Sequence, residues 1–284
     1  MAILIYSLRK YIVRKNNAEG NSYEGLETDT YHKKTGGMRR AGAFAACDRI
    51  GVPRAAEKVF AVAEGERRLP IYCVQTEKPQ VSVSFDAAWG ADDTDELLRI
   101  LKENGVKATF FLCGYWVEKY PEEVKKIAAE GHDLGNHSAT HPHMSRISSE
   151  EIAQELQKCH ENVKKLTGVE MELFRPPFGE YDNHVIETAE QNGYYTIQWD
   201  VDSLDWKEQG AEAEIRQVLE HKHLGNGSII LFHNDAKYTP KVLDTILKGI
   251  KEKGFEIVPI SQLIHRENFE MDHEGRQIPK GKDV

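Results

Sequence analysis

Two histidines four residues apart, His137 and His141, have the clearest potential for chemistry in this chain. Gly135 and Asn136 precede them and Pro142 follows, so the run reads as a loop leaving a strand and not as the face of a helix. Imidazole is the usual nitrogen ligand of zinc and similar ions, and a catalytic metal site keeps one position open for water. The pair therefore predicts a divalent metal site in a loop.

Further polar residues follow stretches that read as strands, each at the point where the strand ends. They are Asp86, Arg175, Asp202, Asp205 and His233. Residues scattered by chance would not collect at strand ends, so we expect these side chains to meet the histidine pair at one rim of the fold. A carboxylate, a permanent cation and a third histidine beside a metal ion are groups suited to acid–base hydrolysis.

The elements that must position these residues alternate between strand and helix patterns from residue 80 to residue 264. Strands are predicted at 81–85, 108–112, 132–136, 173–175, 194–199, 228–232 and 255–258. Helices are predicted to begin near 93, 121, 148, 182, 211 and 239, where caps or prolines precede apolar residues at helical spacing. Such β–α units give a parallel sheet, either open and doubly wound or closed. About seven units favour an α/β fold of the distorted (β/α)7-8 barrel type, whose active sites lie at the C-terminal ends of the strands.

Bulk composition narrows the function classes. The chain has 284 residues, of which 40% are hydrophobic and 29% charged, and its net charge is −9. This charge offers no basic surface, so we expect no nucleic acid partner. No run of 18 or more apolar residues occurs, so we expect no stable membrane span. The widely spaced Cys47, Cys73, Cys113 and Cys159 form no CxxC pair, and we expect ordinary buried thiols.

Composition also divides the chain into three parts. Residues 1–65 form an N-terminal extension, expected to be largely disordered with a helix within 41–63. Residues 66–264 form the folded domain. Residues 265–284 form a polar C-terminal tail, expected to be frayed. The apolar run near the N-terminus is too short for a good signal-peptide core.

Five short motifs occur in order along the β–α pattern. They are SFDAAWG at 84–90, HSATH at 137–141, RPPFG at 175–179, DSLDW at 202–206 and LFH at 231–233. With these motifs the chain resembles, over residues 80–263, the polysaccharide deacetylases of the NodB-homology type, carbohydrate esterase family 4. The form SFDAAWG, with LPIYCV upstream, is most similar to a subset found in spore-forming bacteria, which suggests a role in sporulation.

The resemblance implies metal-dependent hydrolysis of N-acetyl groups from an amino-sugar polymer, peptidoglycan or a chitin-like glycan, with release of acetate. It implies that His137 and His141 hold the metal ion, zinc in preference to cobalt or manganese. Asp86 would be the general base that takes a proton from water, and Arg175 would keep it oriented and ionised. The DxxDW and LxH motifs would supply the general acid.

In the same resemblance, His233 would donate a proton to the leaving amine, and Asp205 would orient His233 and favour its protonated form. Trp206 and Leu231 would form the wall of the acetyl pocket, and Pro177 and Phe178 would also contact substrate. Trp89 and Trp116 either line the groove, where sugars stack on them, or pack in the core.

One position departs from the family pattern. The family has a second aspartate directly after the base, which completes an Asp-His-His metal set, and this chain has Ala87. Asp92, Asp93 or water would have to replace the missing ligand, although Asp93 is better explained as a helix N-cap. Two histidines without a carboxylate should bind metal more weakly, because one charged oxygen ligand is lost.

Three functions follow from this sequence. The first is a metal-dependent polysaccharide N-deacetylase, a hydrolase of linear amides. The second is a carbohydrate-binding protein that kept the barrel and lost turnover, and only Ala87 favours it. The third is a hydrolase of another small amide on the same scaffold. We expect a monomer that acts outside the cytoplasm or at the cell surface, where the implied N-acetylated glycan lies.

Overall fold

The fold was analysed in a computed structural model, which describes residues 67–280. The predicted N-terminal extension, including the helix expected within 41–63, lies outside the described residues. In the part of the chain that the structure describes, no helix is both long enough and apolar enough to cross a bilayer.

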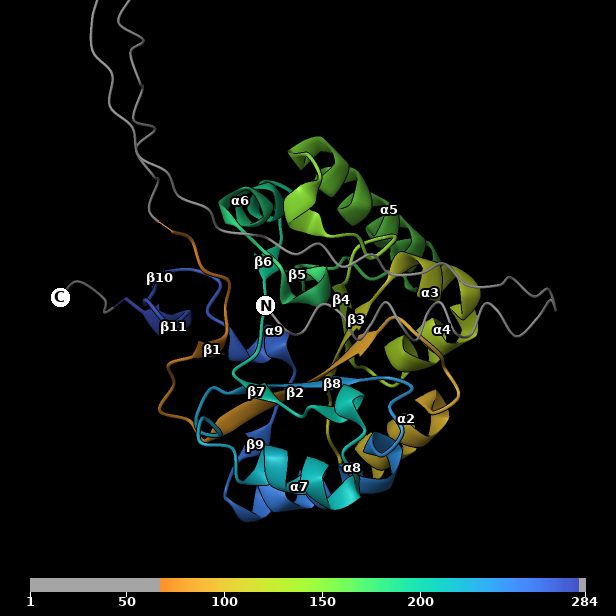
Figure 1. Ribbon diagram of the computed structural model, residues 1–284, viewed down its shortest axis with the longest axis vertical. Helices are drawn as coiled ribbons and strands as arrows, with labels where there is room; N and C mark the ends of the chain where they lie inside the picture. The colour runs from red at the N-terminus through yellow and green to blue at the C-terminus, as the bar shows by residue number, and fades with distance from the viewer. Residues whose placement is uncertain (1–66, 281–284) are drawn as a thin grey trace, which may run out of the picture. The chain divides into compact units, whose positions relative to one another are not determined.

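The central element is a parallel sheet with the strand order β6-β5-β4-β3-β2-β8-β7, in which β9 also pairs with β2 (Figure 1). Its strands are β2 (Gln80–Ala87), β3 (Thr109–Leu112), β4 (Asp133–Asn136), β5 (Leu173–Phe174), β6 (Tyr195–Thr196), β7 (Val201–Asp202), β8 (Ile229–His233) and β9 (Glu256–Ile257). Every pairing among them is parallel. Seven strands in this order form a half-barrel surrounded by helices, which confirms the predicted α/β barrel class.

Helices connect the strands. They are α2 (Thr94–Glu103), α3 (Gly114–Lys119), α4 (Pro121–Ala129), α5 (Ser149–Thr167), α6 (Asn183–Gln191), α7 (Ala211–Leu219), α8 (Thr239–Glu252) and α9 (Ile260–Leu263), with short 3-10 turns η1 (Met144–Arg146), η2 (Pro177–Gly179) and η3 (Asp205–Lys207). Figure 1 shows α5 and α6 on one side of the strands and α7 and α8 on the other. Ser148 and Glu151 form a capping box at the start of α5, which confirms the helix start predicted near 148. Asp93 stands at the N-cap of α2, but its side chain makes no cap hydrogen bond.

Alternation along the strands creates two apolar layers. Phe110, Phe174 and Ile230 belong to a cluster shared with the helices. Their neighbours Phe111 and Ile229 belong to a second cluster on the other face of the strands. Because successive side chains of a strand point to opposite faces, both faces of this sheet are buried. The side chains of β8 from Ile229 to Phe232 are accordingly all buried.

The C-terminal segment is ordered, which corrects the expectation of a frayed tail. Strands β10 (Phe269–Met271) and β11 (Arg276–Pro279) form an antiparallel hairpin, and β11 pairs in parallel with β1 (Cys73–Val74). The β1 segment in turn makes isolated bridges from Ile71 to Ile197 and from Cys73 to Ser228. The polar tail is thus held by backbone pairing, which composition alone does not reveal.

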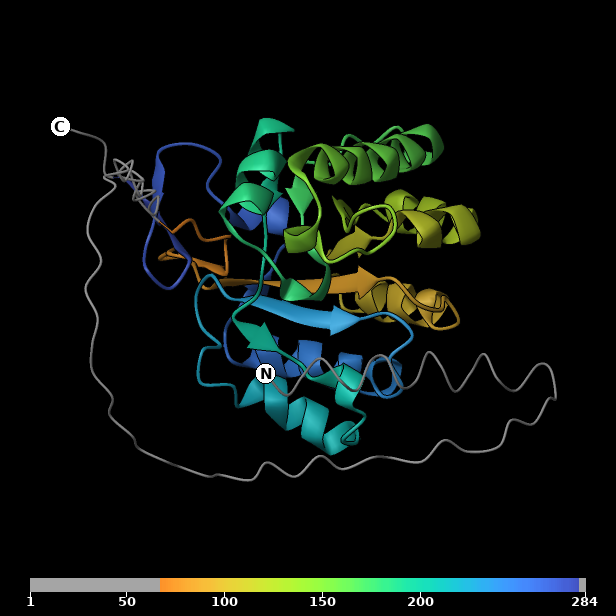
Figure 2. The same cartoon turned by 45° about the horizontal axis from the view of Figure 1, so that its top comes forward.

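The strand that carries Asp86 and the strand that carries His233 lie side by side. Figure 2 shows the orange β2 and the blue β8 running in the same direction through the centre of the fold. Their C-terminal ends therefore meet at one edge of the sheet, which is where the polar side chains of the motifs gather.

Candidate active site

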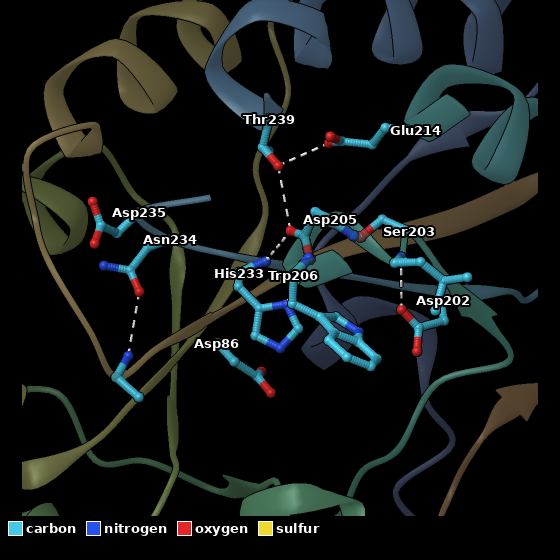
Figure 3. Close-up of polar contacts among 12 residues, drawn as sticks. Asp86, Asp202, Ser203, Asp205, Trp206, Glu214, His233, Asn234, Asp235 and Thr239 are labelled. Atoms are coloured by element: carbon cyan, nitrogen blue, oxygen red, sulfur yellow. Dashed lines mark hydrogen bonds and ion pairs between the residues drawn. The ribbon is translucent and has the colours of Figure 1, made fainter. Parts of the chain in front are cut away.

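The register of two parallel strands brings Asp86 and His233 together. In the β2–β8 ladder Asp86 is the partner of His233, and Ser84 is the partner of Leu231. The Asp86 side chain is nearly buried, and Figure 3 shows its carboxylate beside the His233 ring. A base candidate and an acid candidate therefore face the same space.

Arg175 holds Asp86 through a buried ion pair. It follows β5, its side chain is fully buried, and its Nη1 donates to Asp86 Oδ1 at 2.7 Å. The guanidinium lies 4.0 Å above the centre of the Phe111 ring, and Nη2 donates to the carbonyl of Gln198. Burial by itself would raise the pKa of the Asp86 carboxyl, but Arg175, His137 and His233 together outweigh burial and hold that pKa below its usual range. Asp86 is therefore ionised at neutral pH.

His137 and His141 face each other in the loop after β4. Their ring centres are 4.9 Å apart, and His137 Nε2 lies 3.7 Å from Asp86 Oδ2. His137 Nδ1 lies 2.7 Å from the carbonyl oxygen of Arg175. A carbonyl only accepts, so Nδ1 carries the proton and Nε2 keeps its lone pair toward the site. Burial lowers the pKa of His137 and lowers that of His141 to about 3, so both imidazoles are neutral.

The conformation of this loop is held by its own polar side chains. Asn136 is fully buried: its amide donates to the carbonyl of Leu156 and to the Tyr194 hydroxyl, and its carbonyl accepts from the N–H of Ser138. Ser138 and His141 both have positive φ, 66° and 57°, and Ser138 Oγ accepts from the His141 N–H. Non-glycine residues in this region are uncommon, so the hydrogen bonds maintain a conformation that the backbone alone disfavours.

His233 is paired with a buried carboxylate. Its Nδ1 lies 2.8 Å from Asp205 Oδ1, and its backbone N–H donates to Asp205 Oδ2 at 2.6 Å. The Asp205 side chain is fully buried, whereas 21% of the His233 side chain is exposed. Burial opposes the charged imidazolium, but Asp205, with smaller contributions from Asp86 and Asp202, outweighs burial and raises the pKa of His233 to about 9. His233 is therefore a protonated acid at neutral pH, with Nε2 free for a substrate.

Aromatic side chains stand exposed around this site. Among the described residues, the large hydrophobic side chains that are most exposed are Trp89, Phe178 and Trp206. The rings of Trp89 and Phe178 lie 6.0 Å and 4.5 Å from the ring of His141, and Trp206 directly follows Asp205. These three residues, called here the aromatic rim, expose aromatic surface at the site.

The other residues singled out in the motifs and around them are buried or shape the backbone, unlike the aromatic rim. Leu231 is 2% exposed within β8, and Pro177 is also buried. Asp202 Oδ1 accepts the N–H of Leu204 and so shapes the turn before Asp205. Trp116 is buried and its indole N–H donates to the carbonyl of Gly90, so it packs in the core.

The fit of these residues to a metal ion is partial. His137 and His141 offer two neutral imidazoles that face each other, which suits a divalent ion such as zinc. Ala87 is fully buried and belongs to the helix-side apolar cluster. Asp93 Oδ2 accepts the N–H of Asp235 instead of facing the histidines. Within residues 67–280 no group of three or more His, Cys, Asp or Glu side chains is arranged to hold a metal.

Two polar residues next to the site were not predicted. Glu214 on α7 and Thr239 at the start of α8 are buried and hydrogen-bonded to each other, and Thr239 also contacts Asp205. One signal was present in the sequence: Glu214 stands four residues before Val218, on the stripe of α7 that is buried. A carboxylate on a buried stripe indicates a polar partner inside the fold, because buried charges require partners.

Comparison with known proteins identifies the family. Residues 74–197 match the family model described as polysaccharide deacetylase. The chain is 34% identical over 190 residues to a peptidoglycan-N-acetylglucosamine deacetylase of Bacillus cereus, an alignment that covers 66% of this chain and 68% of the relative. It is 36% identical over 195 residues to the uncharacterized protein YlxY of Bacillus subtilis, with coverages of 69% and 60%. This chain belongs to the polysaccharide deacetylase family.

Among solved structures, the wild-type protein BA3943 of Bacillus anthracis is similar, with a TM-score of 0.66 and 31% identity over 75% of this chain and 73% of that chain. It is described as a pseudoenzyme of the CE4 family. A mutant of BA3943 described as having restored enzymatic activity has a TM-score of 0.66 and 36% identity, over 68% of this chain and 70% of that one. The predicted family is thereby confirmed, and the likeness to the sporulation subset stays a prediction.

Proposed function

We propose that this protein removes N-acetyl groups from an amino-sugar polymer by metal-dependent hydrolysis and releases acetate. The observation that carries the proposal is the pairing of Asp86 with His233 across β2 and β8, with Arg175 on Asp86 and Asp205 on His233. One carboxyl held ionised and one imidazole held protonated, side by side on two paired strands, supply a base and an acid at the same pH.

Asp86 takes a proton from water while the water oxygen bonds to the acetyl carbonyl carbon. His233 then gives its Nε2 proton to the amide nitrogen as the C–N bond breaks, which leaves acetate and a free amine. Arg175 keeps Asp86 ionised and oriented, and Asp205 does the same for the His233 imidazolium. A divalent ion held by His137 and His141 would polarise the acetyl carbonyl and lower the pKa of bound water.

The aromatic rim supports a polymeric substrate. A sugar presents C–H groups on one ring face, and an exposed aromatic ring offers a matching apolar surface. Trp89 and Phe178 are exposed beside His141, and Trp206 is exposed next to Asp205, so they suit a chain that crosses the site better than a small closed substrate. We propose peptidoglycan, the substrate named for the Bacillus cereus relative, as the polymer, and therefore action outside the cytoplasm.

Acetate release from defined N-acetylated glycan oligomers tests this function. We expect release by the wild type with added zinc or cobalt, its loss after chelation, and its recovery when the metal is restored. His137→Ala should lose release and weaken metal binding, whereas His223→Ala, which removes an exposed histidine, should change neither. Activity that is indifferent to chelation, or that survives in His137→Ala, would refute the metal-dependent mechanism.

A second function has its own supporting observation. Ala87 occupies the place of the family's third metal ligand, and the similar BA3943 is described as a pseudoenzyme. A protein that kept the rim and lost turnover would bind the same glycan without releasing acetate. Glycan binding in a pull-down or by calorimetry, together with no acetate release at saturating zinc, would favour this function over the first.

A further inference from the structure

A second buried carboxyl group lies behind Asp205, outside the residues that the proposed reaction uses. Glu214 on α7 is 5% exposed, and its Oε1 lies 2.8 Å from Thr239 Oγ1. Thr239 is fully buried, and the same hydroxyl oxygen lies 3.3 Å from Asp205 Oδ2. Figure 3 shows the line of contacts from Glu214 through Thr239 to Asp205 and His233.

The hydroxyl of Thr239 has one proton for two carboxyl neighbours. Asp205 Oδ1 already accepts from the N–H of Trp206 and from His233 Nδ1, and Oδ2 accepts from the backbone N–H of His233. If Glu214 carries a proton, it can donate to Thr239 Oγ1, and Thr239 then donates to Asp205. If Glu214 is ionised, the hydroxyl turns to the nearer Glu214 oxygen, and Asp205 loses a donor.

We propose that Glu214 is a positioning residue for His233, which acts through Thr239 and Asp205 by deciding where the Thr239 hydroxyl donates. The inference rests on the proposed function, in which His233 is the general acid. Loss of the Thr239 donor leaves the Asp205 charge less neutralised, and ionised Glu214 adds a second negative charge nearby. Both changes stabilise the His233 imidazolium, so the pKa of His233 rises when Glu214 ionises.

Burial provides independent support for a proton on Glu214. It raises the pKa of Glu214 to about 7, against the hydrogen bond from Thr239 that lowers it. The titratable group whose charge acts on Glu214 is Asp205, and those whose charges act on His233 are Asp205, Asp86 and Asp202. The exchange of hydrogen-bond direction therefore falls near neutral pH, below the range in which His233 itself loses its proton.

The test follows the His233 ring by nitrogen and proton NMR against pH in metal-free protein, with His233→Gln used to assign the signals. In the wild type we expect a small additional inflection near pH 7. In Glu214→Gln the inflection should vanish and the pKa of His233 should be lower, because Gln is neutral and can donate to Thr239. Glu212→Gln is the matched control, since Glu212 is an exposed glutamate of the same helix, and it should behave like the wild type.

Thr239 variants test the route. Thr239→Val removes the hydroxyl and keeps the shape, so the effect of Glu214→Gln on His233 should shrink in that background, whereas Thr239→Ser should preserve it. Identical His233 titrations in the wild type, Glu214→Gln and Thr239→Val would overturn the inference. Should Glu214→Gln fail to fold, the remaining variants still test the inference. The inflection in the His233 titration should be present in the wild type and in Thr239→Ser and reduced in Thr239→Val, and its absence from the wild type would overturn the inference.

The rate gives a second readout. Above pH 8, Glu214→Gln should release acetate about twofold to fivefold more slowly than the wild type. The lower pKa leaves a smaller fraction of His233 protonated, and this fraction limits protonation of the amine. A changed His233 titration in a protein that releases no acetate would defeat the proposed function and leave the coupling intact. Normal acetate release with an unchanged His233 titration would support the proposed function and overturn the coupling of Glu214 to His233.

Discussion

Arg175 and Asp86 form a buried ion pair in which Nη1 and Oδ1 are 2.7 Å apart and the two side chains are 0% and 7% exposed. The pair links two strands that are 89 residues apart in the chain. A buried charge that loses its partner is strongly unfavourable, so the pair couples the ionisation of the proposed base to the stability of the domain.

The first prediction concerns Asp86→Asn. We expect acetate release to fall by about 10²–10⁴-fold, because the amide cannot take a proton from water. The free energy of unfolding should also fall by about 3–5 kcal/mol, since Arg175 is left buried without its counter-charge. Glu252→Gln, which changes an exposed carboxylate at the end of α8, should affect neither quantity. Urea denaturation and acetate release measure the two effects separately; full activity in Asp86→Asn would remove the base assignment.

The second prediction concerns pH. The pKa of His233 is raised from 6.5 to about 9, so acetate release should decline as pH rises through 9 and the acid loses its proton. Stability follows the same sign. The folded protein binds this proton more tightly than the unfolded chain, so the contribution is fully present below pH 6.5 and is lost as pH rises through 9.

Asp205→Asn tests the cause of this decline, which is the alkaline limb of the pH profile. Removal of the carboxylate charge should lower the pKa of His233 and move the alkaline decline of kcat/KM to lower pH. Asp202→Asn should produce a smaller displacement in the same direction, because Asp202 is a weaker influence on His233 than Asp205 is. An alkaline limb that stays in place in Asp205→Asn would show that another group governs it.

The third prediction addresses the missing carboxylate. Ala87→Asp should bind zinc at least about tenfold more tightly and release acetate faster, since a charged oxygen ligand is added to two imidazoles. Without metal the variant should unfold more easily than the wild type, because position 87 is fully buried. Added zinc should recover that loss in thermal unfolding.

Ala88→Asp is the control for this substitution. Residue 88 is 3% exposed, so the added carboxylate carries a comparable burial cost. It should destabilise the protein without any gain in zinc affinity. Equal zinc affinities of Ala87→Asp and the wild type would instead mean that a carboxylate at position 87 stays on the helix side of β2.

The fourth prediction concerns the aromatic rim. Trp89→Ala should raise KM for a glycan oligomer about threefold to tenfold, which is the size of one lost ring contact, and should leave kcat nearly unchanged. The same substitution should have little effect on a single N-acetylated sugar, which is too short to reach beyond the site. A comparison of steady-state kinetics on the two substrates measures the difference. A fall in kcat without a change in KM would point to a disturbed His141 instead.

The meeting of the motif residues follows from the sequence because each one ends a strand. Asp86, His137, Arg175 and His233 stand at the C-terminal ends of β2, β4, β5 and β8, and parallel strands share that edge. What the sequence does not provide is the register, which makes Asp86 the direct partner of His233 and not a more distant neighbour.

Other features depend on partners that a local pattern cannot identify. Strand β11 is polar, and its partner β1 lies about 200 residues earlier in the chain, so local periodicity predicts a loose tail. Asp93 has the residue type and position of a helix cap, but its Oδ2 accepts from the distant N–H of Asp235 and its side chain makes no cap hydrogen bond. The spacing of Glu214 from Val218 hints at a buried position that the exposed Glu212 lacks, but the contact of Glu214 with Thr239 depends on the packing of α7 against α8.

The pairing of β11 with β1 has a consequence for biosynthesis. Cys73 and Arg276 are register partners. Strand β1 is therefore synthesised early, but it can pair only after β11, one of the last strands of the domain, has left the ribosome. Contacts between such distant segments form slowly, because a long loop must close before they are gained. A nascent chain that lacks the final hairpin leaves the edge of β1 unpaired, and premature termination should therefore yield a species prone to association with other unfinished chains.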